Sequence, residues 1–283
     1  MPDRSMIPAR LSRILSGRYR NRLAKSRRAR RALFEQFEDR RMLATIVVNS
    51  LSDVTANDNR VTLREAIEAA NTNASVDGSV AGEAGADTIV FREGLAGTIS
   101  LTQDELAIIE SLTIQGPVAD RLVISGGDAS RLFIFGGAGS NDYAISGLTF
   151  ADGNGDGTLN NGFGGRCAMF DPDDTLSIDS SVIRDSTATS GGGIFVNLGT
   201  LRLTASTMHD NQAASGGGGI ALQNVQNAVF ENVTVSGNQA TTTGGGICSC
   251  GIFAGRTSSL EINQSTIANN QSPAGSCDSQ PVG

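Results

Sequence analysis

Residues 201–220 read LRLTASTMHDNQAASGGGGI, and residues 228–247 read AVFENVTVSGNQATTTGGGI. Both stretches hold two apolar residues at i and i+2, a third five positions later, an Asn three positions after that, and a glycine run that ends in Ile. The same pattern runs through residues 175–272. Its apolar pairs are Leu176 with Ile178, Leu201 with Leu203, Ala228 with Phe230, and Leu260 with Ile262.

The period of this repeat predicts the architecture. Upstream, Ile109, Leu112 and Ile114 match the pattern, as do Ile145, Leu148 and Phe150. If Ile114, Phe150, Ile183, Met208, Val235 and Ile267 are equivalent, the copies are separated by 36, 33, 25, 27 and 32 residues. A period of this length, built from short strands and polar turns, is typical of a solenoid. Residues at i and i+2 share one face of a strand, and one copy cannot bury that face alone. We therefore expect an all-β fold in which successive coils stack.

Composition and charge agree with stacked coils. The 283-residue chain holds 35 Gly and only 5% aromatic residues, whereas a compact enzyme core of this size usually contains more aromatic bulk. Residues 1–44 hold 13 Lys and Arg against 4 Asp and Glu, and the rest of the chain holds 9 against 25. Because binding to phosphates needs clustered cations, this acidic body is not expected to have a nucleic-acid partner.

The basic segment 1–44 is expected to lie outside the fold, disordered or cleaved. It lacks the apolar run of about seven or more residues that an ordinary secretory signal needs. Residues 34–44, FEQFEDRRMLA, resemble the N-terminal motif of planctomycete-type extracellular proteins, with Phe37 in place of the usual Leu. The resemblance implies export. A basic arm that binds an anionic surface or nucleic acid is the alternative.

One helix is predicted before the coils. Thr62 and Glu65 have the spacing of a capping box, and Asn71 is the predicted stop. Four residues at i, i+3, i+4 and i+7 form one apolar face: Leu63, Ala66, Ile67 and Ala70. A single amphipathic helix in front of a solenoid would cover its first open coil and block pairing at that edge.

Two further resemblances concern the body of the chain. Residues 61–66 (VTLREA) and 85–91 (GADTIVF) resemble the CSLREA-type N-terminal module of bacterial β-helix surface proteins, with Val61 in place of that family's Cys. The glycine runs and the tetrads ending in Asn211, Asn238 and Asn270 resemble polymorphic-outer-membrane-protein-like repeats, although Gly153 and Ser186 replace Asn in earlier copies. These resemblances imply a right-handed parallel β-helix that is secreted or displayed at the cell surface and is often adhesive.

The repeated Asn and Gly residues are expected to be structural. Asn211, Asn238 and Asn270 should stack at one corner, where their amides can bond to one another and to the backbone. The glycine runs are expected at turns that need a positive φ.

One loop has the start of a calcium-binding motif. Asp152, Asn154 and Asp156 alternate with glycines in the order D-x-N-x-D-G, so that their oxygens can converge on one hard cation. Phe163 stands where such loops carry a bidentate Glu. A plain loop between coils is the alternative, and Ca²⁺ is the only cofactor that the sequence suggests.

The four cysteines suggest one disulfide bond. Cys167 takes the place of an inward-facing Ile, whereas Cys248 and Cys250 are expected to face outward on one strand. In an oxidising compartment, Cys248 or Cys250 can bond to Cys277. A metal site built on the same thiols would lack a fourth ligand.

No catalytic residue can be assigned. The carboxylates crowd only at Asp173, Asp174, Asp179, Asp185 and Asp210. A glycosidase needs two carboxylates about 5–10 Å apart. Asp185 and Asp210 should be neighbours in adjacent coils, and His209 should face solvent. Arg184 and Arg202 are exposed cations without a motif.

Two functions remain open. We favour a non-catalytic extracellular or cell-surface β-helix repeat protein, structural or adhesive, with cell-surface components or polysaccharide as partners. The alternative is a polysaccharide-active β-helix enzyme, a lyase or a glycoside hydrolase. A short member of a longer family is compatible with both.

The expected division of the chain is a basic segment 1–44, a cap 45–100, coils 101–275 and a tail 276–283. No transmembrane segment is expected. The last coil would leave an open edge, so we expect end-to-end self-association.

Overall fold

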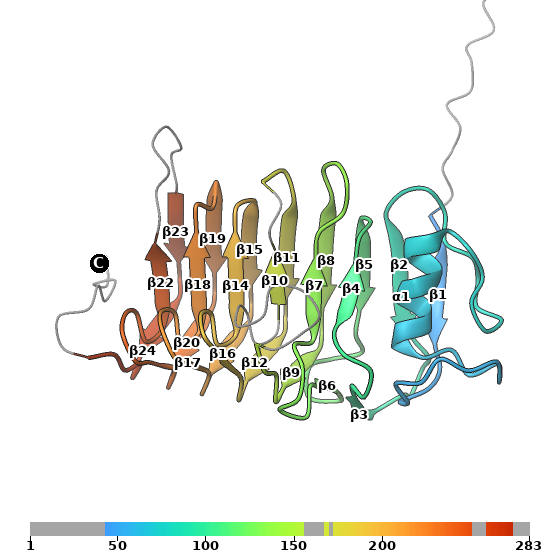
Figure 1. The fold of residues 1–283 in the computed structure, drawn as a ribbon, viewed down its shortest axis with the longest axis horizontal. Coiled ribbons are helices and arrows are strands. Elements are labelled where there is room, and N and C mark those ends of the chain that lie inside the picture. The colour runs from blue at the N-terminus through green and yellow to red at the C-terminus, as the bar shows by residue number, and fades with distance from the viewer. Residues whose placement is uncertain (1–42, 156–166, 170–171, 251–258, 274–283) are drawn as a thin grey trace, which may run out of the picture. The chain divides into compact units, whose positions relative to one another are not determined.

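The computed structural model describes residues 43–155, 167–169, 172–250 and 259–273, with only the backbone described at residues 167–169 and Cys250. The expectations for residues 1–42 and 276–283 lie outside these ranges. Within them, the chain winds into stacked coils whose strands pair in parallel (Figure 1). The predicted all-β parallel coil with one helix is confirmed.

The first sheet runs along the whole stack in the order β1-β2-β5-β8-β11-β15-β19-β23. Its strands are β1 (Thr45–Val48), β2 (Asp87–Phe91), β5 (Leu112–Gln115), β8 (Asp142–Ser146), β11 (Thr175–Asp179), β15 (Thr200–Thr204), β19 (Asn227–Glu231) and β23 (Ser259–Asn263). The predicted apolar pairs lie in register, because Leu203 aligns with Ile178 on one side and with Phe230 on the other. Residues 45–100, the segment expected as the cap, contain β1 and β2 of this sheet and β3 of the second sheet.

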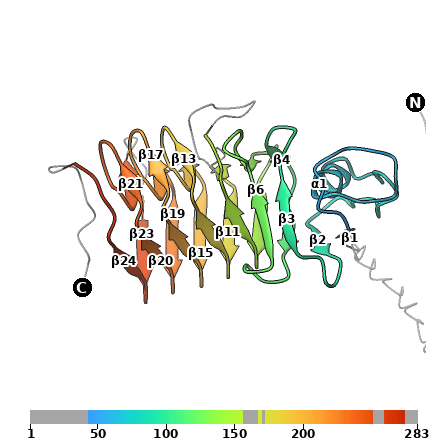
Figure 2. The same ribbon diagram turned by 90° about the horizontal axis from the view of Figure 1, so that it is seen from below.

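The second sheet has the order β24-β20-β16-β12-β9-β6-β3. Its strands are β3 (Gly97–Ser100), β6 (Leu122–Ser125), β9 (Thr149–Ala151), β12 (Val182–Arg184), β16 (Thr207–His209), β20 (Thr234–Ser236) and β24 (Thr266–Ala268). Figure 2 shows strands of successive coils lying side by side. Met208 aligns with Ile183 and Val235, as the repeat predicted.

One assignment in the repeat was wrong. Ile114 aligns with Ile145 in the first sheet, and Ile124 is the residue that aligns with Phe150 in the second sheet. The reason is an inserted turn, because residues 116–121 separate β5 from β6 where two residues separate β15 from β16. The longer turn moved the third apolar position beyond the expected spacing.

The other two sheets close each coil. The third sheet consists of β4 (Leu106–Ile108), β7 (Phe133–Phe135), β10 (Cys167–Met169), β14 (Ile194–Asn197), β18 (Ile220–Gln223) and β22 (Ile247–Cys250). The fourth consists of β13 (Thr187–Ala188), β17 (Gln212–Ala213) and β21 (Gln239–Ala240). The glycine runs connect the fourth sheet to the third. Gly191, Gly217 and Gly244 have the predicted positive φ, and a Cβ at Gly218 would lie 2.2 Å from the carbonyl oxygen of Gly245 in the next coil.

The helix α1 (Leu63–Thr72) forms as predicted at its start. Thr62 and Glu65 make both bonds of the capping box, and the four residues of the apolar face are buried. The end was predicted two residues early, because the left-handed C-cap is Asn73, with φ of 53°. Asn71 instead contacts the neighbouring strand, since its side chain donates to Ala107 O at 2.8 Å and accepts from Ile109 N at 3.1 Å.

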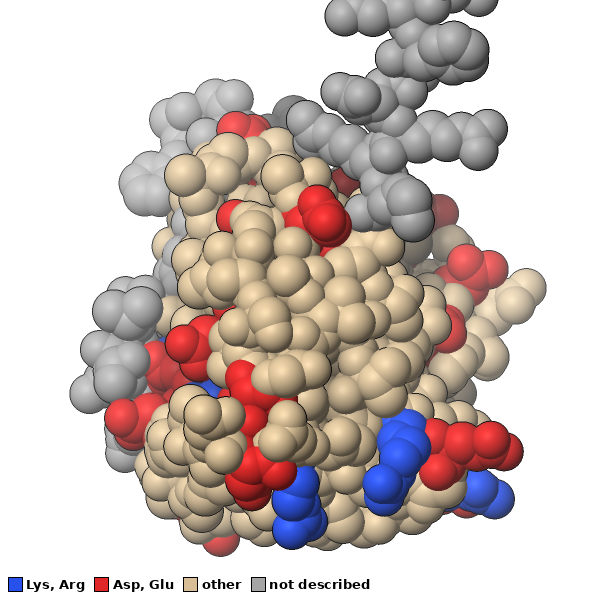
Figure 3. Space-filling view, turned by 90° about the vertical axis from the view of Figure 1, so that its right-hand side faces the viewer, with Lys and Arg blue, Asp and Glu red and all other residues tan. Residues whose placement is uncertain are grey.

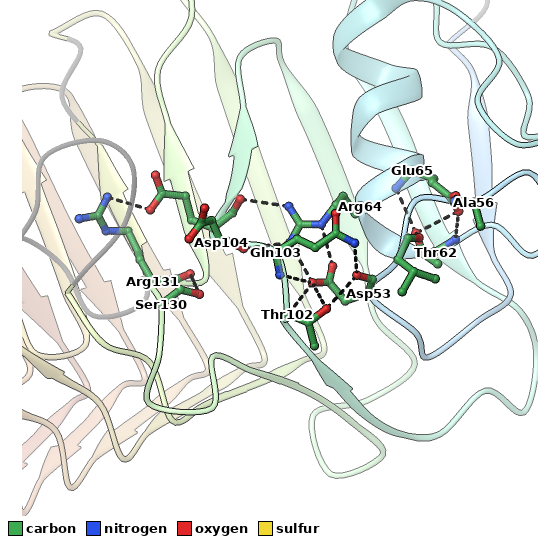
Figure 4. Close-up of polar contacts among 12 residues, drawn as sticks. Asp53, Ala56, Thr62, Arg64, Glu65, Thr102, Gln103, Asp104, Ser130 and Arg131 are labelled. Carbon is green, nitrogen blue, oxygen red and sulfur yellow. Dashed lines mark hydrogen bonds and ion pairs between the residues drawn. The ribbon is translucent and has the colours of Figure 1, made fainter.

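These contacts place α1 against β4, the edge strand of the third sheet. Arg64 lies seven residues before Asn71 and donates to the carbonyl oxygens of Asp104 and Glu105, at 2.9 and 3.3 Å. Its guanidinium also binds the buried Asp53 at 2.8 Å, as Figure 4 shows. Asp53 in turn accepts from Thr102 N at 2.6 Å. The helix therefore covers the edge as predicted, and side chains supply the hydrogen bonds that a further strand would have made.

Candidate functional site

The turn from the second sheet to the fourth places an acidic side chain in three successive coils. Asp152, Asp185 and Asp210 each follow the last residue of a strand, β9, β12 or β16, and have φ of 55°, 57° and 56°. Neighbouring strands lie about 4.8 Å apart, so these residues form a row along the stack. We call Asp152, Asp185 and Asp210 the acidic row. The equivalent residues in the next two coils, Gly237 and Asn269, have the same left-handed backbone conformation.

The inner side of the same turn is a ladder of amides. Asn238 Oδ1 accepts from the backbone N of Asn211 at 3.0 Å and from its Nδ2 at 2.9 Å. Asn270 Oδ1 does the same for Asn238, at 3.0 and 2.9 Å. Asn211 and Asn238 are fully buried. The predicted structural stack is confirmed. Asn211 Oδ1 also accepts from Ser186 N at 3.2 Å, so the ladder joins the turn after Asp185 to the turn after Asp210.

Each carboxylate of the acidic row has a partner close by. Asp152 accepts from Ser125 Oγ at 2.9 Å, Asp185 forms an ion pair with Arg184, and Asp210 Oδ2 lies 2.7 Å from His209 Nδ1. Arg184 and His209 are in register, so Asp185 and Asp210 lie in adjacent coils as predicted.

The acidic row is an exterior feature. The side chains of Asp185 and Asp210 are 43% and 60% exposed. A glycosidase usually keeps its general acid in an apolar setting that holds the proton on the carboxyl group. The row places exposed carboxylates beside the side chains of Arg184 and His209.

The other predicted carboxylates are not brought into this row. Asp174 is buried in the turn before β11, where it accepts from Asn141 N at 2.8 Å and from Tyr143 Oη at 3.2 Å. Asp179 ends β11 in the first sheet and accepts from Ser180 Oγ at 2.8 Å. Arg202 faces outward on β15 in the same sheet. These residues serve the turns and the sheet exterior.

The calcium-like loop is described only in part, because Asp156 lies outside the described ranges. Asn154 donates its side-chain amide to Asp128 O at 3.0 Å, and Asp152 belongs to the acidic row. Within the described ranges, no three His, Cys, Asp or Glu side chains are grouped to hold a metal ion. Ca²⁺ binding by Asp152, Asn154 and Asp156 stays a prediction.

Cys248 is disulfide-bonded, and its partner lies outside the side chains that the structure describes. The pairing of Cys248 or Cys250 with Cys277 therefore stays a prediction. Cys248 is on the opposite side of β22 from Ile247, but it is buried. The turn before β22 covers it, with Thr243 Oγ1 3.5 Å from its Sγ.

A buried ion pair was not predicted from the sequence. Arg131 has no exposed surface, and its Nη1 lies 3.6 Å from Glu105 Oε2 (Figure 4). Its Nη2 donates to Gly155 O at 3.0 Å, within the calcium-like loop. The signal in the sequence was an Arg directly before the apolar run Leu132 to Phe135. Because a buried charge needs a partner, this pair links β4 to the coil that follows.

A shallow hollow of about 480 Å³ lies beside the cap. Ile109, Glu110, Gly137 and Asn141 are among the residues that line it. Asn73 donates to both oxygens of Glu110, at 3.2 and 3.3 Å. Among the described residues, the hollow holds no group of three His, Cys, Asp or Glu side chains, and we assign it no chemistry.

Comparison with known proteins supports the architecture. A family model described as the right handed beta helix region matches residues 133–280, just over half of the chain. No curated protein and no solved structure matches the chain. Among the described residues, no helix has the length and hydropathy of a membrane span.

Proposed function

Because this chain belongs to the right-handed β-helix family, we propose that it is a non-catalytic, extracytoplasmic repeat protein with a structural or adhesive exterior. Its partners are cell-surface components or polysaccharide. The proposal depends mainly on one observation, the arrangement of the outward-facing side chains of the first sheet.

One row of these side chains consists of uncharged polar groups, whereas the next outward row includes Arg202 and Glu261. Thr175, Thr200, Asn227 and Ser259 align in four successive coils. The second sheet carries a similar row of Thr207, Thr234 and Thr266. Hydroxyl and amide groups repeated about every 4.8 Å suit contact with an extended partner along the stack. Such rows supply hydrogen bonds without a deep pocket.

Two features support a location outside the cytoplasm. Cys248 is disulfide-bonded, and disulfides persist in oxidising compartments. The segment before the fold resembles an export motif, and the VTLREA residues hold the N-cap and the first turn of a helix of the kind that the CSLREA resemblance implies. End-to-end self-association stays a prediction beside this proposal.

The test is retention of the full chain on insoluble polysaccharides and on cell envelopes. We expect retention, and we expect the double variant Thr200→Lys with Asn227→Lys to lose it. The matched control is Gln212→Lys with Gln239→Lys, an exposed in-register pair on the fourth sheet outside both rows, which should still bind. If the unaltered chain is retained on none of these surfaces, or if the control loses retention equally, the proposed role of the first sheet is wrong.

The enzyme alternative has one observation in its favour. Asp185 and Asp210 lie in adjacent coils beside Arg184 and His209, so two carboxylates and two cationic or basic groups share one exterior corner. Incubation with pectate, alginate and similar polymers distinguishes the functions. New reducing ends or unsaturated uronates that disappear in Asp185→Asn and Asp210→Asn would establish the enzyme and overturn the binding role.

A further inference from the structure

Asp87 is a buried carboxylate without a cationic partner in the described ranges. It is 1% exposed and lies at the first residue of β2. Its Oδ1 accepts from Ala44 N at 3.0 Å. Both of its oxygens accept from Glu83 N, at 3.3 and 3.1 Å. Backbone N–H groups reduce the cost of burying a charge, but a counter-ion reduces it further.

The surroundings of this carboxylate leave little space. A Cβ at Gly82 would lie 2.7 Å from Asp87 Oδ2 and 2.6 Å from Ala69 O. No side chain can therefore approach from this direction. The group that can bring a positive charge to Oδ1 is the nitrogen that already lies there, the backbone N of Ala44.

Ala44 is also the first residue of the described ranges that takes part in strand pairing. Its carbonyl oxygen accepts from Thr88 N at 2.9 Å, which starts the pairing of β1 with β2. Ala44 is buried, whereas Leu43 is 56% exposed. The chain therefore passes from exposed to buried across one peptide bond, at the last residue of the basic segment 1–44. Figure 3 shows this end of the coils, where acidic side chains are spread widely and basic ones lie at the lower margin.

We propose that the Leu43–Ala44 peptide bond is a processing site and that the new α-amino group of Ala44 forms a buried ion pair with Asp87. A peptidase catalyses the hydrolysis. Water adds OH to the acyl carbon of Leu43 and H to the nitrogen of Ala44 as the C–N bond breaks. The released amine takes up a proton at neutral pH. The resulting ammonium occupies the position from which Ala44 N now donates.

Neighbouring bonds would not give the same pair. A terminus at Leu43 would place the charge on an exposed residue. The Cα of Leu43 lies one residue, about 3.8 Å, from the Cα of Ala44. A terminus at Thr45 would remove the nitrogen that faces Asp87 and the carbonyl oxygen that starts the strand pairing. The inference does not depend on what the exterior binds.

The first experiment determines the N-terminus of the protein recovered from its native cells by mass spectrometry. We expect a body that begins at Ala44. An uncleaved chain, or a body that begins at any other residue, would overturn the proposal. This measurement needs no variant, so it is decisive even if a substitution at Asp87 prevents folding.

The second experiment measures the ion pair itself. In the full chain, residues 40–43 are replaced by Ile-Glu-Gly-Arg, so that factor Xa cleaves directly before Ala44. Cleavage should raise the melting temperature by about 5 °C, the shift expected for a buried pair in a chain of this size. In the matched Asp87→Asn protein, cleavage should give no gain. An unchanged melting temperature after cleavage, or an equal gain in Asp87→Asn, would contradict the pairing.

Discussion

At the scale of single residues, the turn beside the acidic row depends on amides that repeat in successive coils. Each Asn side chain accepts from the backbone of the coil before it and donates to carbonyl oxygens at the same bend. Asn238, for example, donates to Met208 O and Ser236 O, at 3.3 and 3.0 Å. A buried backbone N–H without an acceptor is costly, so the amides are required for the bend.

Substitution of Asn238 should therefore be strongly destabilising. Asn238→Ala leaves the N–H of Asn211 without its acceptor, and we expect a loss of about 3 kcal/mol in the free energy of unfolding. Gln239→Ala, at the exposed neighbouring position, should change it by no more than about 0.5 kcal/mol. Urea unfolding followed by circular dichroism measures both. Equal effects at the two positions would argue against the ladder.

The buried pair of Arg131 and Glu105 gives a second prediction at this scale. Arg131→Met leaves the carboxylate of Glu105 buried beside an apolar group, and we expect a loss of about 3–5 kcal/mol. Adding Glu105→Leu removes the buried negative charge as well, so the double variant should recover part of the loss. A double variant whose loss equals the sum of the single losses would show that the two side chains are energetically independent.

At the scale of elements, α1 covers the edge of the third sheet. Its side chains bond to the backbone at β4, where a further strand would otherwise pair. Asn71 contacts the backbone of β4 and its following residue, and Arg64 binds the carbonyl oxygens before it. The helix therefore satisfies an edge that would otherwise be open to pairing with another chain.

Asn71→Ala should loosen this edge locally. The N–H of Ile109 loses its acceptor, so its amide hydrogen should exchange at least about tenfold faster, the change that corresponds to one lost hydrogen bond. Thr72→Ala serves as the control, because the Thr72 hydroxyl bonds to Glu68 O within the helix. Hydrogen exchange measured by NMR gives the result. Unchanged exchange at Ile109 would mean that the helix does not hold the edge.

The loop around α1 should also respond to acid. The backbone N–H of Asn59, and after it that of Arg60, lower the pKa of the Asp77 carboxyl below its usual value. Because the pKa is lowered on folding, its contribution to stability is complete above about pH 4 and is lost as the pH falls through the lower folded value.

The measurement is amide exchange of Asn59 and Arg60 between pH 2 and pH 6, corrected for the intrinsic rate. Protection should fall at the acid end in the unaltered chain, and Asp77→Asn should remove this pH dependence. Glu93→Gln, which removes a different exposed carboxylate, should leave it intact. A pH dependence that survives Asp77→Asn would assign it to another group.

At the scale of the whole molecule, the coils from Phe150 onward could be predicted because five residues separate the apolar positions of the first and second sheets in each copy. Ile114 was misassigned because its coil carries a longer turn, and a repeat pattern cannot show where an insertion falls. Arg131 stands out in the sequence because it precedes an apolar run, but nothing local identifies Glu105 as its partner, since stacking alone brings these residues together. The Asp87 contact with Ala44 was hidden for the same reason.

The central claim is that successive copies of the repeat occupy successive layers of one stack. The most direct test replaces outward-facing residues of the first sheet, two at a time, with amino acids that carry a keto group. A spin label is attached to each keto group, and the distance between the two labels is measured. Thr45 and Glu261 are seven strand steps apart, and Ala144 and Glu261 are four. With about 4.8 Å per step, the stack predicts Cα separations of about 34 and 19 Å. If the two distances are similar, or if the distance between Thr45 and Glu261 is shorter than that between Ala144 and Glu261, the stacked arrangement is contradicted.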